Sequence, residues 1–406
     1  MRRFFISLPS KIMVFFFTFL FVCFSCFYSD HVNAQVKPKG ENIIVGAEQV
    51  SFYLPMLLGK RVGLVVNQTS QVGNKHLVDV LLKNKVNVQA VFAPEHGFRG
   101  NHDAGEKFSS SVDEKTGIPL ISIYGKNRKP PASTMADLDV IVFDIQDVGV
   151  RFYTYISSMH YMMEAASDAG VHFIVFDRPN PNGAIVDGPV LEPEFTSFVG
   201  MHEIPLVHGM TVGELALMFK GEGWLNTTNA LELSVVNIKN YQRTMPYLLP
   251  IKPSPNLPNS VAIKLYPSLG FFEATPVSIG RGTDFPFQVI GHDKISIGDF
   301  TFIPVSKPGA ASSPKLMNKN LKGEDLRHLD IQGIDLTFLI KWHQAFQAEN
   351  TSFFTRASFM DKLSGTDKLR KAIIAGQTAQ AIKLSWQQNL TKFKRLRKPY
   401  LLYKDL

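Results

Sequence analysis

Short apolar runs alternate with amphipathic stretches from about Lys60 to Lys239. The runs are rich in Val, Ile and Phe and are apolar at successive positions, as in strands buried on both faces of a parallel sheet. They are Val62–Val66, Val88–Ala93, Leu120–Tyr124, Val140–Ile145, Phe173–Phe176 and Leu233–Ile238. Helical stretches lie between them, such as Lys75–Lys83 and Ser157–Ala169, the latter ending at Gly170 as a C-cap would. The alternation predicts an α/β fold with a Rossmann-like, open and mostly parallel sheet.

The pattern changes after Tyr241, where proline becomes dense. Glycine-rich, strand-like pieces then lie between Ser278 and Ile303, and helical stretches follow at Asp335–Glu349, Asp367–Ala375 and Thr378–Asn389. We therefore expect a Rossmann-like domain over residues 35–241 and a second, smaller α+β domain over residues 242–406, with the active cleft between them. The basic segment Lys392–Lys398 is interpreted as a helix end that docks a final strand at Tyr400–Tyr403. Contact with an anionic envelope polymer is the alternative for the basic segment.

The N-terminus has the features of an export signal. Arg2 and Arg3 precede an apolar run from Ile12 to Tyr28, and Val32-Asn33-Ala34 is a small-residue pattern that a signal peptidase cuts. The sequence predicts a signal peptide over residues 1–34 and a periplasmic or secreted protein. An uncleaved anchor is the alternative, because 17 apolar residues approach the length that spans a bilayer.

Composition narrows the chemistry. With 45% apolar residues the chain of 406 residues is not a disordered protein, and its formal net charge of +8 is moderate. Both cysteines, Cys23 and Cys26, lie in the apolar run near the N-terminus. A mature chain without them has no disulfide framework, thiolate metal site or cysteine nucleophile. Lipid modification of Cys26 is an alternative that its flanking residues match poorly.

Polar side chains follow four of the apolar runs. Because ligands of open parallel sheets bind at the carboxyl ends of the strands, we expect these tails to line one cleft. Ordinary solvated loops are the other interpretation of polar strand ends. The tails are Asn67–Thr69, Pro94–Gly100, Asp144–Asp147 and Asp177–Gly183.

Several familiar sites are missing from the sequence. The segment after the first run, Asn67–Gly73, lacks the G-x-G-x-x-G that binds a dinucleotide, so we expect no nucleotide cofactor. We also expect no nucleic-acid partner. His96 and His102 flank Asp103 without a clear third ligand, and we expect no metal or other cofactor. A G-x-S-x-G nucleophile elbow is also absent.

Carboxylate chemistry remains. Glu95 lies at one strand end beside His96 and Arg99, and Asp144 and Asp147 lie on another tail. Hydrolysis of a glycosidic bond needs one carboxylic acid to protonate the leaving oxygen. It also needs a second group that activates water, attacks the sugar or orients a group on the sugar. Nearby tyrosines and amides suit a sugar ligand.

Eight segments together resemble one family, that of the exo-β-N-acetylmuramidases, which was long known as a domain of unknown function. The resemblance extends from about Val45 to Tyr403. It is fainter at Gly105–Asp113 and His292–Lys315, so it does not extend to the length of the substrate or to the contacts at the rim of the site. The matching segments are Pro94–Gly100 (PEHGFRG), Val142–Tyr155, Asp177–Gly183 (DRPNPNG), Val186–Pro189, Ser197–Met201, Val207–Glu214, Pro253–Asn256 and Ser278–Thr283 (SIGRGT).

The resemblance implies a glycosidase of peptidoglycan recycling that removes terminal N-acetylmuramic acid from the non-reducing end of MurNAc–GlcNAc fragments. It also implies that Glu95, in the PEHGFRG segment, is the catalytic glutamate, and we expect it to be the general acid. Asp144 or Asp147 is the expected nucleophile or base. Alternatively the 2-acetamido group of the substrate attacks, with an aspartate or Tyr155 positioning it.

We expect the remaining candidates to bind substrate. The lactyl carboxylate of muramic acid calls for a cation, for which Arg99, Arg151, Arg178 and Arg281 are candidates. His208 and Glu273 are further candidates, although each could be a satisfied core group. The full binding set is Asn67, Gln68, His96, Arg99, Gln146, Arg151, Tyr153, Arg178, Asn180, His208, Glu273 and Arg281.

Two other classes of function compete with this hypothesis. One is a metal-dependent phosphoesterase or amidase that uses Glu95, His96, Asp144 and Asp147. The other is a non-catalytic protein whose two lobes close on a muropeptide sugar.

Overall fold

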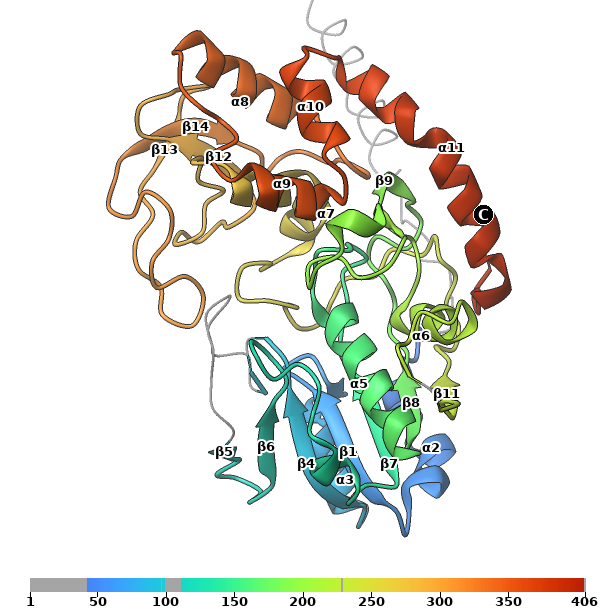
Figure 1. Cartoon of the computed structure of the whole chain (residues 1–406). Coiled ribbons are helices and arrows are strands. Elements are labelled where there is room, and N and C mark those ends of the chain that lie inside the picture. Colours follow the sequence, from blue (N-terminus) through green and yellow to red (C-terminus); the bar gives the residue numbers. More distant parts are fainter. Residues whose placement is uncertain (1–41, 96, 99–110, 228, 405–406) are drawn as a thin grey trace, which may run out of the picture. The chain divides into compact units, whose positions relative to one another are not determined.

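A computed structural model describes residues 42–95, 97–98, 111–227 and 229–404. Within these residues seven strands form one sheet in the order β11-β8-β7-β1-β4-β6-β5 (Figure 1). Every neighbouring pair is parallel except β5 and β6. The mostly parallel sheet predicted from the apolar runs is therefore confirmed. Its strands are β1 (Arg61–Val66), β4 (Asn87–Ala93), β5 (Ser111–Val112), β6 (Pro119–Ser122), β7 (Val140–Asp144), β8 (His172–Phe176) and β11 (Leu233–Val236).

Alternate residues of the central strands enter two separate apolar cores. In β7, Val140 and Val142 pack on one face, whereas Ile141 and Phe143 pack on the other. The first face is covered by α2 (Val50–Leu57) and α3 (Leu77–Lys83), and the second by α5 (Tyr155–Ala169) and α6 (Val212–Gly221). Burial on both faces explains why the strands are apolar at successive positions. The helix α5 ends at Gly170 with a left-handed φ of 64°, as predicted.

Short elements decorate the sheet and its loops. The short helix α4 adds Met135 to the same core as α5. Two antiparallel pairs, β2 with β3 and β9 with β10, lie outside the main sheet. The bounds are α4 (Ala132–Met135), β2 (Gln71–Val72), β3 (Lys75–His76), β9 (Asp187–Val190), β10 (Pro205–Val207) and the 3-10 turns η1 (Gly46–Glu48) and η2 (Pro193–Phe195).

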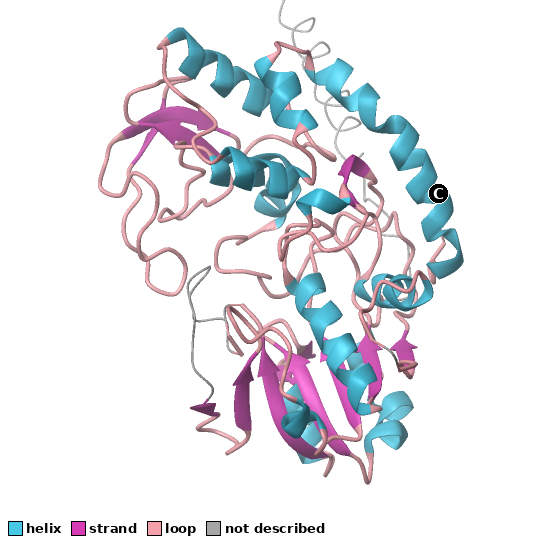
Figure 2. Cartoon of the chain, in the orientation of Figure 1, coloured by secondary structure: helices cyan, strands magenta, loops and turns pink. Residues whose placement is uncertain are grey.

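The C-terminal part is a smaller α+β arrangement, as expected. A three-stranded antiparallel sheet in the order β12-β14-β13 is accompanied by helices and long loops (Figure 2). Its elements are α7 (Ser260–Leu269), η3 (Gly270–Ala274), β12 (Val289–His292), β13 (Phe300–Phe302), β14 (Leu321–Asp325), α8 (Thr337–Ala348), α9 (Ala357–Ser364), α10 (Lys368–Ile374), α11 (Ala379–Arg397) and η4 (Lys398–Tyr400). The domain boundary at residue 241 stays a prediction.

The chain end differs from its prediction. Residues 392–397 belong to α11, but Tyr400–Tyr403 forms no strand, because η4 occupies its start and no partner strand adjoins the rest within the described residues. Side-chain bonds hold this end instead: the Tyr403 hydroxyl donates to Asp177 Oδ2 at 2.6 Å. The predicted signal peptide lies outside the described residues. Within them, no helix combines the length and apolarity needed to cross a bilayer.

Glu214 on α6 joins the chain end to the sheet domain. Its fully buried carboxylate accepts two bonds from Arg243, at 2.7 and 2.9 Å, and bonds from the backbone N–H groups of Leu402 and Tyr403. It also accepts from the N–H of Thr211, which closes a capping box at the start of α6. A buried charge is tolerated only with such partners.

We expect Glu214→Gln to lower the free energy of unfolding by about 3–5 kcal/mol, because it leaves the Arg243 guanidinium buried without its counter-charge. Glu222→Gln, on the same chain segment, is the matched control. Glu222 is half-buried and accepts one bond, from the Tyr400 hydroxyl, so its loss should stay within about 1 kcal/mol. Denaturant unfolding of both variants makes the comparison, and equal losses would contradict the role of Glu214.

Candidate active site

Three of the four predicted tails, those after β1, β7 and β8, gather at the carboxyl edge of the sheet and bond to one another. Thr69, after β1, accepts from the N–H of Gln146, after β7, at 3.0 Å. The Gln146 amide in turn donates to the carbonyl of Pro179, after β8, at 2.7 Å. Asn67 Oδ1 accepts from the N–H and the hydroxyl of Thr69. Asn67 and Gln146 are buried, and the bonds they make join the strand ends to one another and do not face a ligand.

Asp144 and Arg178 form a buried ion pair at this edge. Arg178 donates to both carboxylate oxygens of Asp144, at 2.6 and 2.9 Å, and to the carbonyl of Gln71. The exposed fractions are 0% for Asp144 and 4% for Arg178. Asn180 is also buried and donates to the carbonyl of Met210 at 2.9 Å. The structure thus places these three predicted site residues inside the protein framework.

Asp147 lies in a tight turn, and its carboxyl is buried. Its Oδ2 accepts from the N–H of Gly149 at 2.6 Å. Gly149 has a φ of 78°, and a Cβ there would come within 2.2 Å of Asn180, so only glycine fits. Burial raises the pKa of Asp147 to about 7. It lowers the pKa of neighbouring His208, whose Nε2 lies 3.8 Å from Asp147 Oδ2, to about 3.

Arg151 connects the sheet domain to the C-terminal part. Its fully buried guanidinium donates to the carbonyls of Pro189, Ile204, Leu363 and Ser364 at 2.7–3.3 Å. Burial without a carboxylate lowers the pKa of Arg151 to about 9. Two other predicted residues make a second connection, since the Tyr153 hydroxyl and the Gln68 amide both donate to the carbonyl of Pro253, at 2.7 and 3.1 Å.

A cavity of about 710 Å³ opens beside these tails. Loops of the sheet domain supply Glu95, Tyr124 and the segment Phe152–Thr154 to its wall, and the C-terminal part supplies Tyr266, Glu273 and Arg281, among others. The cavity is therefore lined by both parts of the chain, as predicted for the active cleft. Of the predicted site residues, Glu95, Tyr153, Glu273 and Arg281 line it, whereas Asp144 and Asp147 do not.

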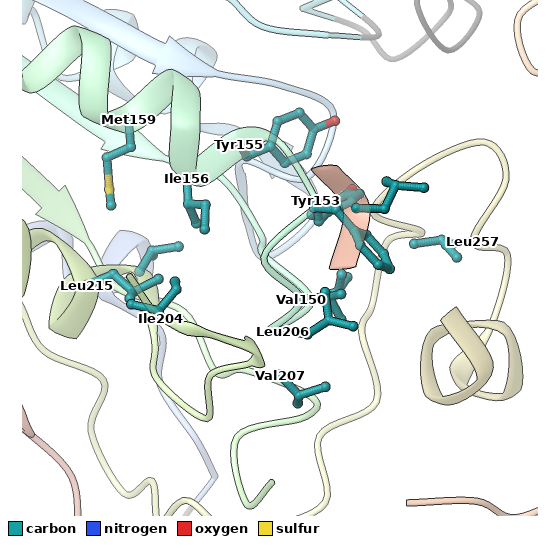
Figure 3. Packing of buried hydrophobic residues seen from close by; sticks show 14 of the residues in the cluster. Val150, Tyr153, Tyr155, Ile156, Met159, Ile204, Leu206, Val207, Leu215 and Leu257 are labelled. Carbon is teal, nitrogen blue, oxygen red and sulfur yellow. The ribbon is translucent and has the colours of Figure 1, made fainter. Parts of the chain in front are cut away.

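Both carboxylate oxygens of Glu95 are held by hydroxyl groups. The Tyr124 hydroxyl donates to Oε1 at 3.0 Å, and the Thr154 hydroxyl donates to Oε2 at 2.9 Å. The Tyr155 hydroxyl donates to the Glu95 backbone carbonyl at 3.4 Å. Tyr153 and Tyr155 lie next to each other at the start of α5, with ring centroids 4.8 Å apart (Figure 3). Glu95 is thus held by Tyr124, which follows β6, and by the segment that follows β7.

Glu273 and Arg281 form an ion pair in the cavity wall that the C-terminal part supplies. Arg281 Nη2 lies 2.6 Å from Glu273 Oε1, and the two side chains are 25% and 31% exposed. Lys315 fixes the backbone here, because its ammonium donates to the carbonyls of Phe272, Glu273 and Thr275 at 2.5–3.1 Å. Burial lowers the pKa of Lys315 to about 8.

Known proteins are similar in sequence to this chain over most of its length. The sequence profiles of the N-terminal and C-terminal parts of the exo-β-N-acetylmuramidase NamZ match residues 62–261 and 264–403. The peptidoglycan β-N-acetylmuramidase NamZ of Bacillus subtilis (strain 168) is 40% identical over 372 residues, which cover 86% of this chain and 89% of that protein. The chain belongs to the NamZ family.

Two crystal structures of DUF1343 family proteins from Bacteroides fragilis NCTC 9343 have the same fold. The first is 46% identical, with a TM-score of 0.83, and the match covers 90% of this chain and all of that one. The second is 31% identical, with a TM-score of 0.78, covering 89% and 99%. The resemblance inferred from the sequence motifs is therefore confirmed.

Not all of the predicted NamZ-family site can be located. His96 and Arg99 lie outside the described residues. Within the part of the chain that is described, no group of three or more His, Cys, Asp or Glu side chains is arranged to hold a metal ion.

Tyr124, Thr154, Lys315 and Arg356 are among the cavity residues that sequence reasoning missed. Tyr124 ends a predicted strand and Thr154 lies in a matching segment, so both carried a signal that was not used. Lys315 lies in a region of faint resemblance, and Arg356 lies in no matching segment. Of these, Tyr124 and Thr154 contact Glu95 directly.

The buried Asp147 predicts a particular pH dependence of stability. A carboxyl with a pKa of about 7 in the folded state and about 4 when unfolded binds its proton more tightly in the folded state. The contribution of this group to the free energy of unfolding is complete below about pH 4. It falls by about 1.4 kcal/mol per pH unit as the pH rises from 4 to 7 and is constant above that. Asp147→Asn removes this loss, so its stability relative to the unmodified protein should increase from pH 4 to 7 and then level off. Denaturant unfolding across this range measures the difference, and a constant difference would contradict the assignment.

Proposed function

We propose that the chain is an exo-acting β-N-acetylmuramidase that releases terminal N-acetylmuramic acid from the non-reducing end of MurNAc–GlcNAc fragments of peptidoglycan. Membership of the NamZ family and the name of the Bacillus subtilis relative support this proposal. The single observation that carries it is the position of Glu95, whose carboxylate faces a large cavity and is oriented by two hydroxyl groups.

Glu95 is the proton donor in this proposal. Cleavage of the glycosidic bond leaves negative charge on the leaving oxygen, and a carboxylic acid within hydrogen-bond distance neutralises that charge in the transition state. Tyr124 and Thr154 fix both oxygens of Glu95, so little reorientation is needed when the substrate arrives.

Aromatic side chains in the cavity wall suit a sugar ring. Tyr124, Phe198 and Tyr266 line the cavity together with small residues from the segment 310–314. An aromatic face packs against the C–H groups of a sugar ring, while neighbouring polar groups bond its hydroxyls. The volume of about 710 Å³ lies within the range of pockets that enclose a small ligand.

Arg356 is the proposed partner of the lactyl carboxylate of muramic acid. Of the predicted cations, Arg151 and Arg178 are bonded within the protein framework, and Arg281 pairs with Glu273. Arg356 lines the cavity, is exposed, and its guanidinium lies 4.4 Å from the Phe359 ring centroid. Among the described residues it makes no ion pair with a carboxylate, so it can bind the substrate's carboxylate in bidentate fashion.

Export completes the proposal. The N-terminal arginines, apolar run and Val32-Asn33-Ala34 support a signal peptide and an envelope location, where peptidoglycan fragments arise.

We expect Glu95→Gln to lower kcat on MurNAc–GlcNAc by about 10²–10⁴-fold, because it keeps the shape of the side chain and removes the transferable proton. The loss should be smaller on an aryl muramide with a good leaving group, which needs less protonation. Mass spectrometry of the products from MurNAc–GlcNAc and GlcNAc–MurNAc measures both activity and the polarity of attack. Turnover near that of the unmodified protein, or cleavage of GlcNAc–MurNAc at an equal rate, would contradict the proposal.

Arg356→Met should raise KM for an aryl N-acetylmuramide about tenfold or more and leave KM for the matching N-acetylglucosaminide unchanged, since only the first sugar carries a lactyl carboxylate. Lys362→Met, at a neighbouring exposed cation, is the control and should affect neither substrate. Equal losses on the two sugars would contradict recognition of the lactyl group by Arg356.

A further inference from the structure

The cavity contains a second carboxylate, and it is not one of the predicted aspartates. Among the described residues, Glu95 and Glu273 are the carboxylates that line the cavity. Asp144 has no exposed surface and is neutralised by Arg178. Asp147 is buried in its turn, and burial raises its pKa to about 7. Neither aspartate is placed to receive charge from a sugar in the cavity.

Glu273 has the charge and exposure that a reacting carboxylate needs. It forms an ion pair with Arg281 through Oε1, as a carboxylate that carries its negative charge does. Its Oε2 has no hydrogen-bond partner among the described residues, and the side chain is 31% exposed. The half-buried Lys315 side chain anchors the backbone of the η3 turn that carries Glu273, because its ammonium donates to three carbonyls there. The carboxylate is therefore held in place with one oxygen available to the cavity.

The charges of Glu95 and Glu273 act on the same neighbouring side chains. Burial raises the pKa of Tyr124, and both carboxylates contribute to this increase, Glu95 more than Glu273. The negative charges of both also act on Arg281 and on Tyr266, which lines the cavity. The two groups come from different parts of the chain, one from the loop after β4 and the other from η3. Both carboxylates therefore line one cavity and lie close enough to act on the same side chains there.

We propose that Glu273 is the second catalytic group, the base that activates the attacking water. In this step the water oxygen forms a bond to the anomeric carbon, and one water proton moves to Glu273 Oε2. The bond from the anomeric carbon to the leaving oxygen breaks with its electron pair, and that oxygen takes the proton of Glu95. Such a direct displacement inverts the anomeric configuration, so a β-muramide gives the α-sugar first. This inference rests on the proposed function.

Glu273→Gln should lower kcat by about 10²-fold or more, with a similar loss on substrates with good and poor leaving groups, because water activation is needed for both. The loss of kcat caused by Glu95→Gln should instead be much larger on substrates with poor leaving groups than on those with good ones. Asp325→Asn is the matched control: it disrupts the ion pair with Arg327, 2.6 Å long and outside the cavity wall, and should leave kcat unchanged. Thermal unfolding of each variant shows that it is folded.

Rescue by azide distinguishes a catalytic role of Glu273 from a purely structural one. With Glu273→Ala and an aryl β-muramide, sodium azide should restore turnover and give the α-glycosyl azide, because azide attacks without needing a base. A purely structural role for Glu273 would show no rescue. Proton NMR of the unmodified enzyme should show the α-anomer first.

The outcomes separate the two proposals. Near-normal turnover by Glu273→Gln, no azide rescue, or the β-anomer formed first would each overturn the role of Glu273 while the muramidase function stands. Failure of the unmodified protein to cleave any muramide would overturn the proposed function itself.

Discussion

Most polar groups at the carboxyl ends of the buried strands find partners inside the protein, and the rest of the site depends on these bonds. The sheet is covered by helices on both faces, so the tails of β1, β7 and β8 have little access to water. Asp144 therefore pairs with Arg178, and Gln146 bonds to its own tail and to the next one. A buried polar or charged group without a partner would lower the free energy of unfolding by several kcal/mol. The edge of the sheet is consequently a bonded layer, and the cavity opens beside it.

A cavity beside the sheet needs a second wall, which the C-terminal part supplies. Its attachment depends on buried donors from the sheet domain that bond backbone carbonyls across the junction. Arg151 reaches Leu363 and Ser364, and Tyr153 reaches Pro253. Carbonyl acceptors place no demand on the side chains of the other part, so its sequence can vary while the junction is kept. The same residues that sequence reasoning assigned to substrate thus maintain the shape of the cavity.

Much of the fold was predictable because it depends on local pattern. Runs apolar at successive positions identified the sheet strands, and Gly170 marked the end of α5. Glu95 was predictable as a polar residue after a buried strand. Residue type and position cannot show whether a strand-end carboxylate faces a cavity or a buried arginine, so Asp144 and Glu95 looked alike. Glu273 was predicted only as a substrate-binding candidate, and Arg356, which also lines the cavity, was not predicted at all, because the packing of distant segments is not encoded in a local pattern.

Thr154 shows how the site takes precedence over local stability. It is the N-cap of α5, where a threonine side chain ordinarily accepts a backbone N–H, yet it makes no such bond and donates to Glu95 instead. The positive end of the α5 dipole and two hydroxyl donors make this a favourable place for a negative charge. Two carboxylates in one cavity repel each other when a bound sugar excludes water, and Arg281 reduces this repulsion because it compensates the charge of Glu273. The threonine that leaves α5 without a side-chain cap therefore serves to hold Glu95 in place.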